Sequence, residues 1–131
     1  MNDKLNLLYV DDEPLNCCIF ETIFSQWFEV AVALNGKQAL ERLSSNPNIS
    51  IIVSDMNMPG MNGLEFIEAA KHINPDIPCF ILSGYEQSIE AEKAIQDGTI
   101  LRYFRKPLNY EEILAGIEQD AAIELQSKVT K

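Results

Sequence analysis

The chain has 131 residues, a length that suits one compact domain. Its formal net charge is −10, from 20 acidic and 10 basic residues, which argues against direct nucleic-acid binding because such surfaces are basic. No apolar run is long enough to cross a membrane, and the polar residues 1–6 do not resemble a signal peptide. We therefore expect a soluble, cytoplasmic protein.

Short apolar runs alternate with amphipathic stretches along the whole chain. Pro14 suits the first turn of a helix, where its missing N–H sacrifices no hydrogen bond, and Ile19 and Ile23 follow at helical spacing. The Ile/Val-rich run 49–54 is typical of a strand buried on both faces. We predict strands over about residues 5–10, 30–33, 49–54, 79–82 and 101–104, and helices over about 14–27, 37–45, 63–73, 87–96 and from 109 past 121.

Five strands that alternate with five helices predict an α/β fold with a doubly wound parallel sheet and helices on both faces. No linker or repeat interrupts the pattern, so we expect one domain over 1–131, with its core at about 4–122. We expect the tail from Gln126 to Lys131 to fray. Periodicity alone leaves several strand orders open.

The three cysteines are Cys17, Cys18 and Cys79. Their odd number and the absence of a CxxC or Cys/His spacing argue against a disulfide framework and against a zinc site. We predict buried, reduced thiols that pack as small apolar side chains.

Polar residues follow the predicted strands at the edge of the sheet where ligands bind in open parallel folds. Asp11 and Asp12 follow the first strand, Asp55 the third and Ser83 the fourth, and Lys106 lies after the fifth. Converging carboxylates repel each other unless a cation neutralises them, and Mg²⁺ prefers such oxygen ligands. Taken singly, Asp11 and Asp12 suit helix capping equally well, and Asp55 suits a turn. Their joint placement favours a site.

An aspartate in such a site can act as a nucleophile toward phosphorus and form an acyl phosphate. Phosphoryl transfer needs positioning and charge neutralisation rather than covalent help from the protein. A metal ion beside Asp55 and the ammonium group of Lys106 would supply that charge, and the Ser83 hydroxyl could donate a hydrogen bond to a phosphoryl oxygen.

Four segments of the chain resemble the receiver domains of bacterial response regulators, over nearly its whole length. Residues 7–14 match the family's opening strand and acidic pair, and residues 53–63 match its phosphoacceptor loop. Residues 81–84 match the segment with the switch hydroxyl, and residues 103–108 match the Lys-Pro segment. This resemblance implies a flavodoxin-like fold with the strand order 2-1-3-4-5.

The resemblance also implies a role for each matched residue. Asp55 is the expected phosphoacceptor. Asp11 and Asp12 are the expected Mg²⁺ ligands, together with Asp55 and the backbone carbonyl of Asn57.

The resemblance gives catalytic roles to Ser83 and Lys106, and it makes Ser83 and Tyr103 the expected switch. Ser83 and Lys106 are expected to contact the phosphoryl oxygens, and Tyr103 is expected to turn inward when Ser83 moves. A cis peptide bond is expected between Lys106 and Pro107. Without the resemblance, an aromatic residue such as Tyr103 at a strand end is more often a packing residue than a moving part.

Three features depart from the family pattern or lie outside it. Ser83 stands where threonine is also common, and 97–102 lacks the Gly-Ala pair found before the last strand of many members, which leaves the start of that strand open. His72 lies late in a predicted helix, away from the strand ends, so we expect a solvated residue and not a phosphodonor.

The function that these residues favour is a phosphorylation-gated switch of a two-component phosphorelay. Its expected partners are a histidine kinase or histidine phosphotransfer protein and a downstream protein target, which binds the surface of the fourth helix, fifth strand and fifth helix. We expect no membrane or direct nucleic-acid contact, and no enzymatic activity beyond the chain's own phosphoryl transfer and dephosphorylation.

Two other classes of function remain as alternatives. A Mg²⁺-dependent phosphohydrolase with an aspartyl-phosphate intermediate needs the same nucleophile, but the haloacid-dehalogenase pattern has a second aspartate where this chain has Asn57. The sequence also has no inserted cap to shield a substrate. A flavin binder suits the fold, but Asp11 and Asp12 stand where its phosphate loop would lie, and a yellow protein would be the sign of one.

Overall fold

The computed structural model describes the backbone of residues 4–84 and 88–129. Five parallel strands form one sheet in the order β2-β1-β3-β4-β5, as predicted. The strands are β1 (Leu5–Val10), β2 (Phe28–Ala33), β3 (Ile49–Asp55), β4 (Cys79–Ser83) and β5 (Arg102–Arg105). The helices are α1 (Pro14–Phe24), α2 (Gly36–Ser45), α3 (Gly63–Ile73), α4 (Ser88–Gln96) and α5 (Tyr110–Val129).

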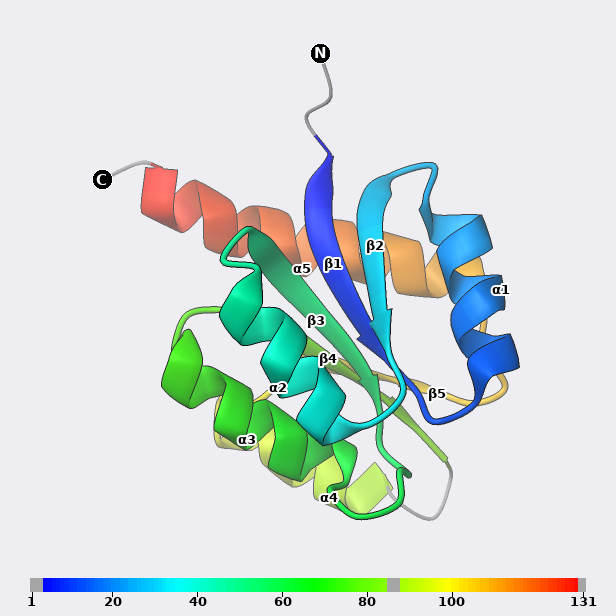
Figure 1. The fold of residues 1–131 in the computed structure, drawn as a ribbon. Helices are drawn as coiled ribbons and strands as arrows, with labels where there is room; N and C mark the ends of the chain where they lie inside the picture. Colours follow the sequence, from blue (N-terminus) through cyan, green and yellow to red (C-terminus); the bar gives the residue numbers. More distant parts are fainter. Residues whose placement is uncertain (1–3, 85–87, 130–131) are drawn as a thin grey trace.

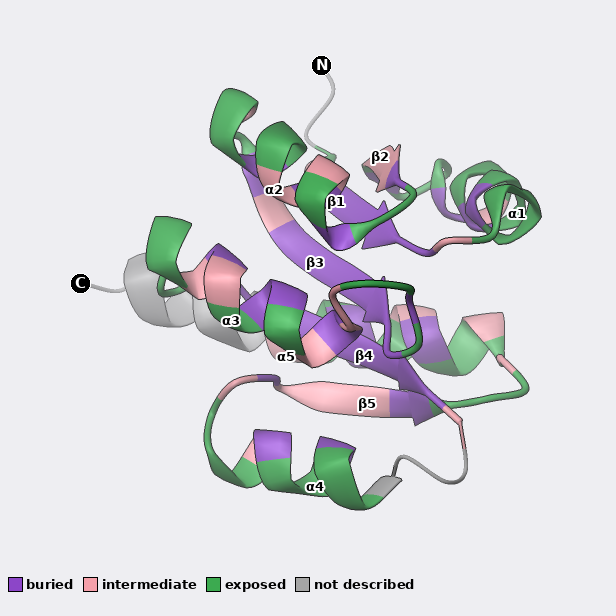
Figure 2. Ribbon diagram, turned by 60° about the horizontal axis from the view of Figure 1, so that its bottom comes forward, coloured by how far each residue is buried: buried purple, intermediate pink, exposed green. Residues whose placement is uncertain are grey.

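Helices cover both faces of the sheet, which gives three layers (Figure 1). One face packs against α2, α3 and α4, whose buried members include Leu43, Phe66 and Ala91. The other face packs against α1 and α5, through side chains such as Phe20 and Ile113. The central strands β3 and β4 are almost entirely buried between these layers (Figure 2). Burial on both faces explains their continuous apolar sequence.

The strand order places β1 between β2 and β3. The connections from β1 therefore leave toward α1 on one face, while β3 continues toward α3 on the other face (Figure 1). A ligand site forms at such a reversal, outside the carboxyl ends of the strands. Here those ends belong to β1 and β3.

Some predicted boundaries are wrong by a few residues. β2 begins at Phe28 rather than at residue 30, because Phe28 is buried and pairs with Leu5 while its neighbour Glu29 faces outward. α1 ends at Phe24 rather than near Trp27, and the Trp27 N–H donates to the Phe24 carbonyl in the turn that follows. β5 begins one residue later than predicted.

The structure does not describe every residue at the start of α4 and at the end of the chain. The predicted start of α4 near Gln87 lies outside the described residues, and so do residues 130–131. α5 continues to Val129, and the fraying predicted from Gln126 onward stays a prediction. No helix in the described part of the chain has the length and apolar character needed to span a membrane.

All three cysteines are free thiols, but they differ in exposure. Cys17 and Cys79 are buried as predicted, whereas Cys18 is exposed, so the prediction is wrong for this residue. Adjacent side chains of a helix point in different directions, and Cys17 takes the inward one on α1.

Gly63 begins α3 directly against the end of β3. A Cβ atom on Gly63 would lie 2.3 Å from the Asp55 carbonyl oxygen and 2.9 Å from Ile81 Cδ1. The Gly63 N–H donates to the Met56 carbonyl at 2.9 Å, which ties the loop that follows Asp55 to the helix. This close approach requires glycine, because the atom in the way belongs to the backbone.

We expect Gly63→Ala to lower the free energy of unfolding by about 2 kcal/mol or more, because overpacking against backbone forces the chain to shift. Urea denaturation measures this loss. Gly36→Ala is the matched control at the first position of α2, where the added Cβ would meet the Met61 Sδ at 2.7 Å, the end of a flexible side chain. Equal losses in the two variants would contradict the explanation.

Candidate functional site

Three carboxylates meet at the carboxyl ends of β1 and β3. Asp11 and Asp12 follow β1, and Asp55 is the last residue of β3. One oxygen from each carboxylate lies within 4.8 Å of the others. Asp11 and Asp55 are buried and Asp12 is half-buried. The structure thus brings together the three acidic residues that the sequence places at separate strand ends.

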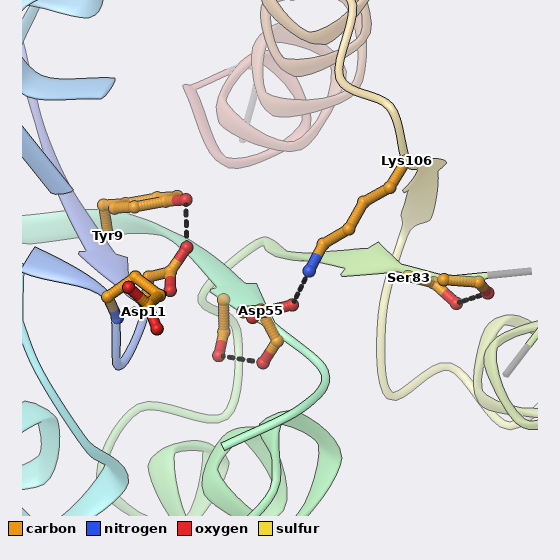
Figure 3. Close-up of polar contacts among 8 residues, drawn as sticks. Tyr9, Asp11, Asp55, Ser83 and Lys106 are labelled. Atoms are coloured by element: carbon orange, nitrogen blue, oxygen red, sulfur yellow. Dashed lines mark hydrogen bonds and ion pairs between the residues drawn. The ribbon is translucent and has the colours of Figure 1, made fainter. Parts of the chain in front are cut away.

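Asp11 is held by hydrogen bonds to both of its carboxylate oxygens. The Glu13 N–H donates to Oδ1 at 3.0 Å, and the buried Tyr9 hydroxyl donates to Oδ2 at 2.8 Å (Figure 3). The Asp11 backbone N–H continues the β1–β2 ladder by donating to the Ala33 carbonyl. Backbone and side chain of Asp11 are therefore both fixed.

Asp55 has only 5% of its surface exposed. Burial raises the pKa of its carboxyl above the ordinary value, and the charge of Asp11 raises it further, while Lys106 and the backbone N–H of Asn57 lower it. Burial prevails because a charged carboxylate loses its water shell. Ionisation of this carboxylate thus carries an electrostatic cost that a cation would relieve.

Lys106 reaches Asp55 from the loop after β5 (Figure 3). Its Nζ lies 2.8 Å from Asp55 Oδ1, and its side chain is 39% exposed. Oδ1 has no hydrogen-bond partner of standard geometry among the described residues, so this contact is an ion pair in which charge rather than direction matters. The Lys106 N–H donates to the Ser83 carbonyl, and the Lys106–Pro107 peptide bond is cis, the configuration that the resemblance implies.

The chemistry of this donor set suits Mg²⁺. Three carboxylates offer hard oxygen ligands at one point, and Lys106 supplies a single positive charge against them. Three carboxylates against one ammonium group leave the cluster with an excess of negative charge that a divalent cation would neutralise. Asn57 is exposed, and coordination by its carbonyl stays a prediction.

The hydroxyl groups of the two expected switch residues bond to partners other than Asp55. Ser83 is fully buried, and its hydroxyl donates to the Gly84 carbonyl at 2.9 Å, on the side away from Asp55 (Figure 3). Tyr103 is half-buried on β5, and its hydroxyl donates to Glu92 Oε2 on α4 at 3.0 Å.

Sequence reasoning missed two side chains that act on this site or its switch. Tyr9 lies two residues before Asp11, and residues at this spacing share one face of a strand, a signal that the sequence did contain. Glu92 contacts Tyr103 from a different element, and no local pattern marks it.

His72 has no place in this cluster. It is exposed in the last turn of α3, roughly 14 Å along the helix axis from Gly63, which adjoins Asp55. The position agrees with the prediction that His72 is a solvated residue.

Comparison with known proteins identifies the family. The model of the response regulator receiver domain matches residues 7–118. The chain is 31% identical over 122 residues to the transcriptional regulatory protein ZraR of Escherichia coli K12, an alignment that covers 92% of this chain and 27% of ZraR. The chain thus spans about a quarter of the length of this relative.

Solved structures agree with the fold. Adenylate cyclase from Rhodopirellula baltica superposes with a TM-score of 0.91 at 29% identity, covering 97% of this chain and 96% of that one. Chemotaxis protein CheY4 of Vibrio cholerae superposes with a TM-score of 0.78 at 27% identity, covering 88% and 98%. The acidic cluster and Lys106 both fall inside the matched residues, and the chain belongs to the response regulator receiver domain family.

Proposed function

We propose that this receiver domain accepts a phosphoryl group on Asp55 and thereby switches the binding of a partner protein. The observation that carries the proposal is the contact of Lys106 Nζ with Asp55 Oδ1 at 2.8 Å, inside a cluster with Asp11 and Asp12. A buried carboxylate between an ammonium group and two further carboxylates is arranged for charge chemistry rather than for packing.

The proposed donor is a phosphohistidine on a histidine kinase or a histidine phosphotransfer protein. An Asp55 oxygen attacks phosphorus, the O–P bond forms, and the N–P bond breaks with its electron pair returning to the imidazole. Lys106 pairs with a phosphoryl oxygen as charge develops. Asp11, Asp12 and Asp55 would hold Mg²⁺, which supplies further positive charge to the transferring group.

A pocket beside the site is the proposed approach for such a donor. The pocket has a volume of about 280 Å³ and is bounded by residues of β1, α1 and the loop after β5, and Asp11 and Lys106 both line it. Asp55 does not line it, so the donor is proposed to reach the cluster from the side of Asp11 and Lys106.

Output is proposed to run through α4, β5 and α5. Phosphorylation puts an acyl phosphate of charge about −2 in place of a singly charged carboxylate, and its oxygens attract the Ser83 hydroxyl and Lys106. Ser83 would exchange its bond to the Gly84 carbonyl for a phosphoryl oxygen, and Tyr103 would leave Glu92 and turn inward. A downstream protein would then meet an altered α4–β5–α5 surface.

The other proposed properties follow from the same features. We propose a cytoplasmic domain without an enzymatic activity other than its own phosphoryl transfer and dephosphorylation, and without direct nucleic-acid contact, because its net charge is −10. A phosphohydrolase is the weaker proposal. The position two residues after Asp55 carries the exposed amide Asn57 rather than a second carboxylate.

The test of the proposed function is labelling by acetyl phosphate in the presence of MgCl₂. Intact-mass spectrometry should show the addition of one phosphoryl group to the wild type, and none to Asp55→Asn or after chelation of Mg²⁺ by EDTA. Asp76→Asn, which removes an exposed carboxylate from the loop between α3 and β4, is the control and should be labelled normally. If Asp55→Asn were labelled as fully as the wild type, the assignment of Asp55 as the phosphoacceptor would be refuted.

The raised pKa of Asp55 makes stability depend on pH. A folded-state pKa above the unfolded value favours folding at low pH, and this contribution is lost as the pH rises through the folded-state pKa. In metal-free buffer at pH 7, Asp55→Asn should therefore increase the free energy of unfolding on the order of 1 kcal/mol, the scale of one like-charge contact in water. Below the ordinary pKa of aspartate the gain should vanish.

Urea denaturation at the two pH values measures this difference, again with Asp76→Asn as the control. A loss of stability in Asp55→Asn at neutral pH would mean that the Lys106 ion pair outweighs burial and carboxylate repulsion, contrary to this account.

The bond from Tyr103 to Glu92 should oppose switching, because it holds the ring beside α4. Glu92→Ala removes this exposed hydrogen bond, which is worth about 0.5–1 kcal/mol. The apparent affinity of the domain for beryllofluoride, used as a mimic of the phosphoryl group, should therefore rise roughly two- to fivefold. Glu90→Ala removes a neighbouring exposed glutamate of α4 and should leave the affinity unchanged. Identical titrations for the two variants would show that the bond plays no part.

A further inference from the structure

Tyr9 is a buried polar residue that the proposed phosphoryl chemistry does not use. It has 1% of its surface exposed, and its hydroxyl donates to Asp11 Oδ2 at 2.8 Å. A buried hydroxyl needs a partner, and here the partner is one of the carboxylates proposed to bind Mg²⁺. The contact therefore joins the apolar side of the sheet to the acidic cluster.

The bond from Tyr9 completes the fixation of the Asp11 carboxylate. The Glu13 N–H donates to the other oxygen, Oδ1, at 3.0 Å. With one donor on each oxygen, rotation of the carboxylate breaks at least one bond. Each oxygen keeps a further lone pair for a cation, because a carboxylate offers about four acceptor sites.

The ring of Tyr9 is itself held in place by aromatic packing. It stacks on Phe20 with a centroid distance of 4.0 Å and an interplanar angle of 8°. Phe20 in turn stacks on Phe24 at 4.2 Å and 20°. These rings lie between β1 and α1, so the hydroxyl cannot follow a displaced carboxylate without disturbing the core.

We propose that Tyr9 is a positioning residue that sets the affinity of the acidic cluster for Mg²⁺ and its preference for Mg²⁺ over Ca²⁺. The inference rests on the proposed magnesium site. Mg²⁺ demands near-ideal octahedral geometry at short distances, whereas Ca²⁺ accepts longer, irregular coordination. A carboxylate held in place by two donors favours the ion with the stricter geometry. Removal of a residue that hydrogen-bonds a metal ligand typically lowers the metal affinity 10- to 100-fold.

A purely structural role for Tyr9 makes a different prediction. If the hydroxyl merely finds a partner in the core, its loss lowers stability and changes the two metal affinities equally or not at all. The ratio of the Mg²⁺ and Ca²⁺ affinities therefore separates positioning from packing.

The variant that tests the proposal is Tyr9→Phe, which keeps the ring and its stacking. Its matched control is Tyr110→Phe. Tyr110 contacts the ring of Phe24 edge-on at 6.0 Å and lines the same pocket as Tyr9, but its hydroxyl donates to no carboxylate among the described residues. Isothermal titration calorimetry of the unphosphorylated wild type and both variants, each with MgCl₂ and with CaCl₂, gives the six affinities to be compared.

We expect Tyr9→Phe to bind Mg²⁺ roughly tenfold more weakly and Ca²⁺ less than about threefold more weakly, with Tyr110→Phe unchanged. An unchanged Mg²⁺ affinity in Tyr9→Phe, or an equal fall for both ions, would overturn the inference while the magnesium site stands. A wild type that binds no Mg²⁺ would overturn the site as well, so the two failures are distinguishable.

A second measurement needs no variant and therefore does not depend on its folding. In wild-type protein with ¹³C-labelled tyrosine, the Tyr9 Cζ resonance should shift on addition of MgCl₂ with the same saturation as the calorimetric titration, because the Asp11 oxygen that it contacts takes part in binding. A Tyr9 Cζ resonance that stays constant while Mg²⁺ saturates the protein would contradict the proposal.

Discussion

The repulsion between three carboxylates within 4.8 Å of one another is the constraint on which this site depends. Lys106 neutralises one charge from the side of β5, and its Nζ contacts only Asp55 among the described acidic residues. Burial of Asp11 and Asp55 removes water that would otherwise screen the repulsion. The domain is therefore folded around an excess of negative charge that a divalent cation would neutralise.

The fold concentrates that charge through its topology. Strands β1 and β3 are parallel neighbours, so residues that follow them arrive at one edge of the sheet although more than forty positions separate them in the chain. Close packing then keeps them there. The missing side chain of Gly63 allows α3 to approach the Asp55 carbonyl, and the aromatic stack of Tyr9 on Phe20 supports Asp11 from the opposite face.

The sequence predicted those parts of the structure that depend on local pattern. The Ile/Val run of β3 and the acidic pair after β1 were sufficient to place Asp11, Asp12 and Asp55 at one edge, and the family resemblance added the strand order and the role expected of Lys106. Phe28 was missed as the start of β2, because the charged and exposed Glu29 separates the buried Phe28 from the apolar residues that follow it.

Local patterns in the sequence do not predict which side chains of different elements contact each other. The bond from Tyr103 to Glu92 depends on how α4 packs beside β5, which no spacing in the sequence encodes. The Ser83 hydroxyl bonds to the carbonyl of the next residue, a choice of partner that the residue types alone do not determine. The Tyr9 bond to Asp11 could have been suspected from strand alternation, but its distance and burial required the structure.

The measurement that tests the account most directly locates the phosphoryl group itself. Borohydride reduction of protein treated with acetyl phosphate converts an aspartyl phosphate to homoserine, and peptide mass spectrometry finds its position. The account predicts homoserine at position 55 alone, formed with Mg²⁺ and absent after chelation. Reduction at Asp11, at Asp12 or outside the cluster, or equal conversion without a divalent cation, would contradict it.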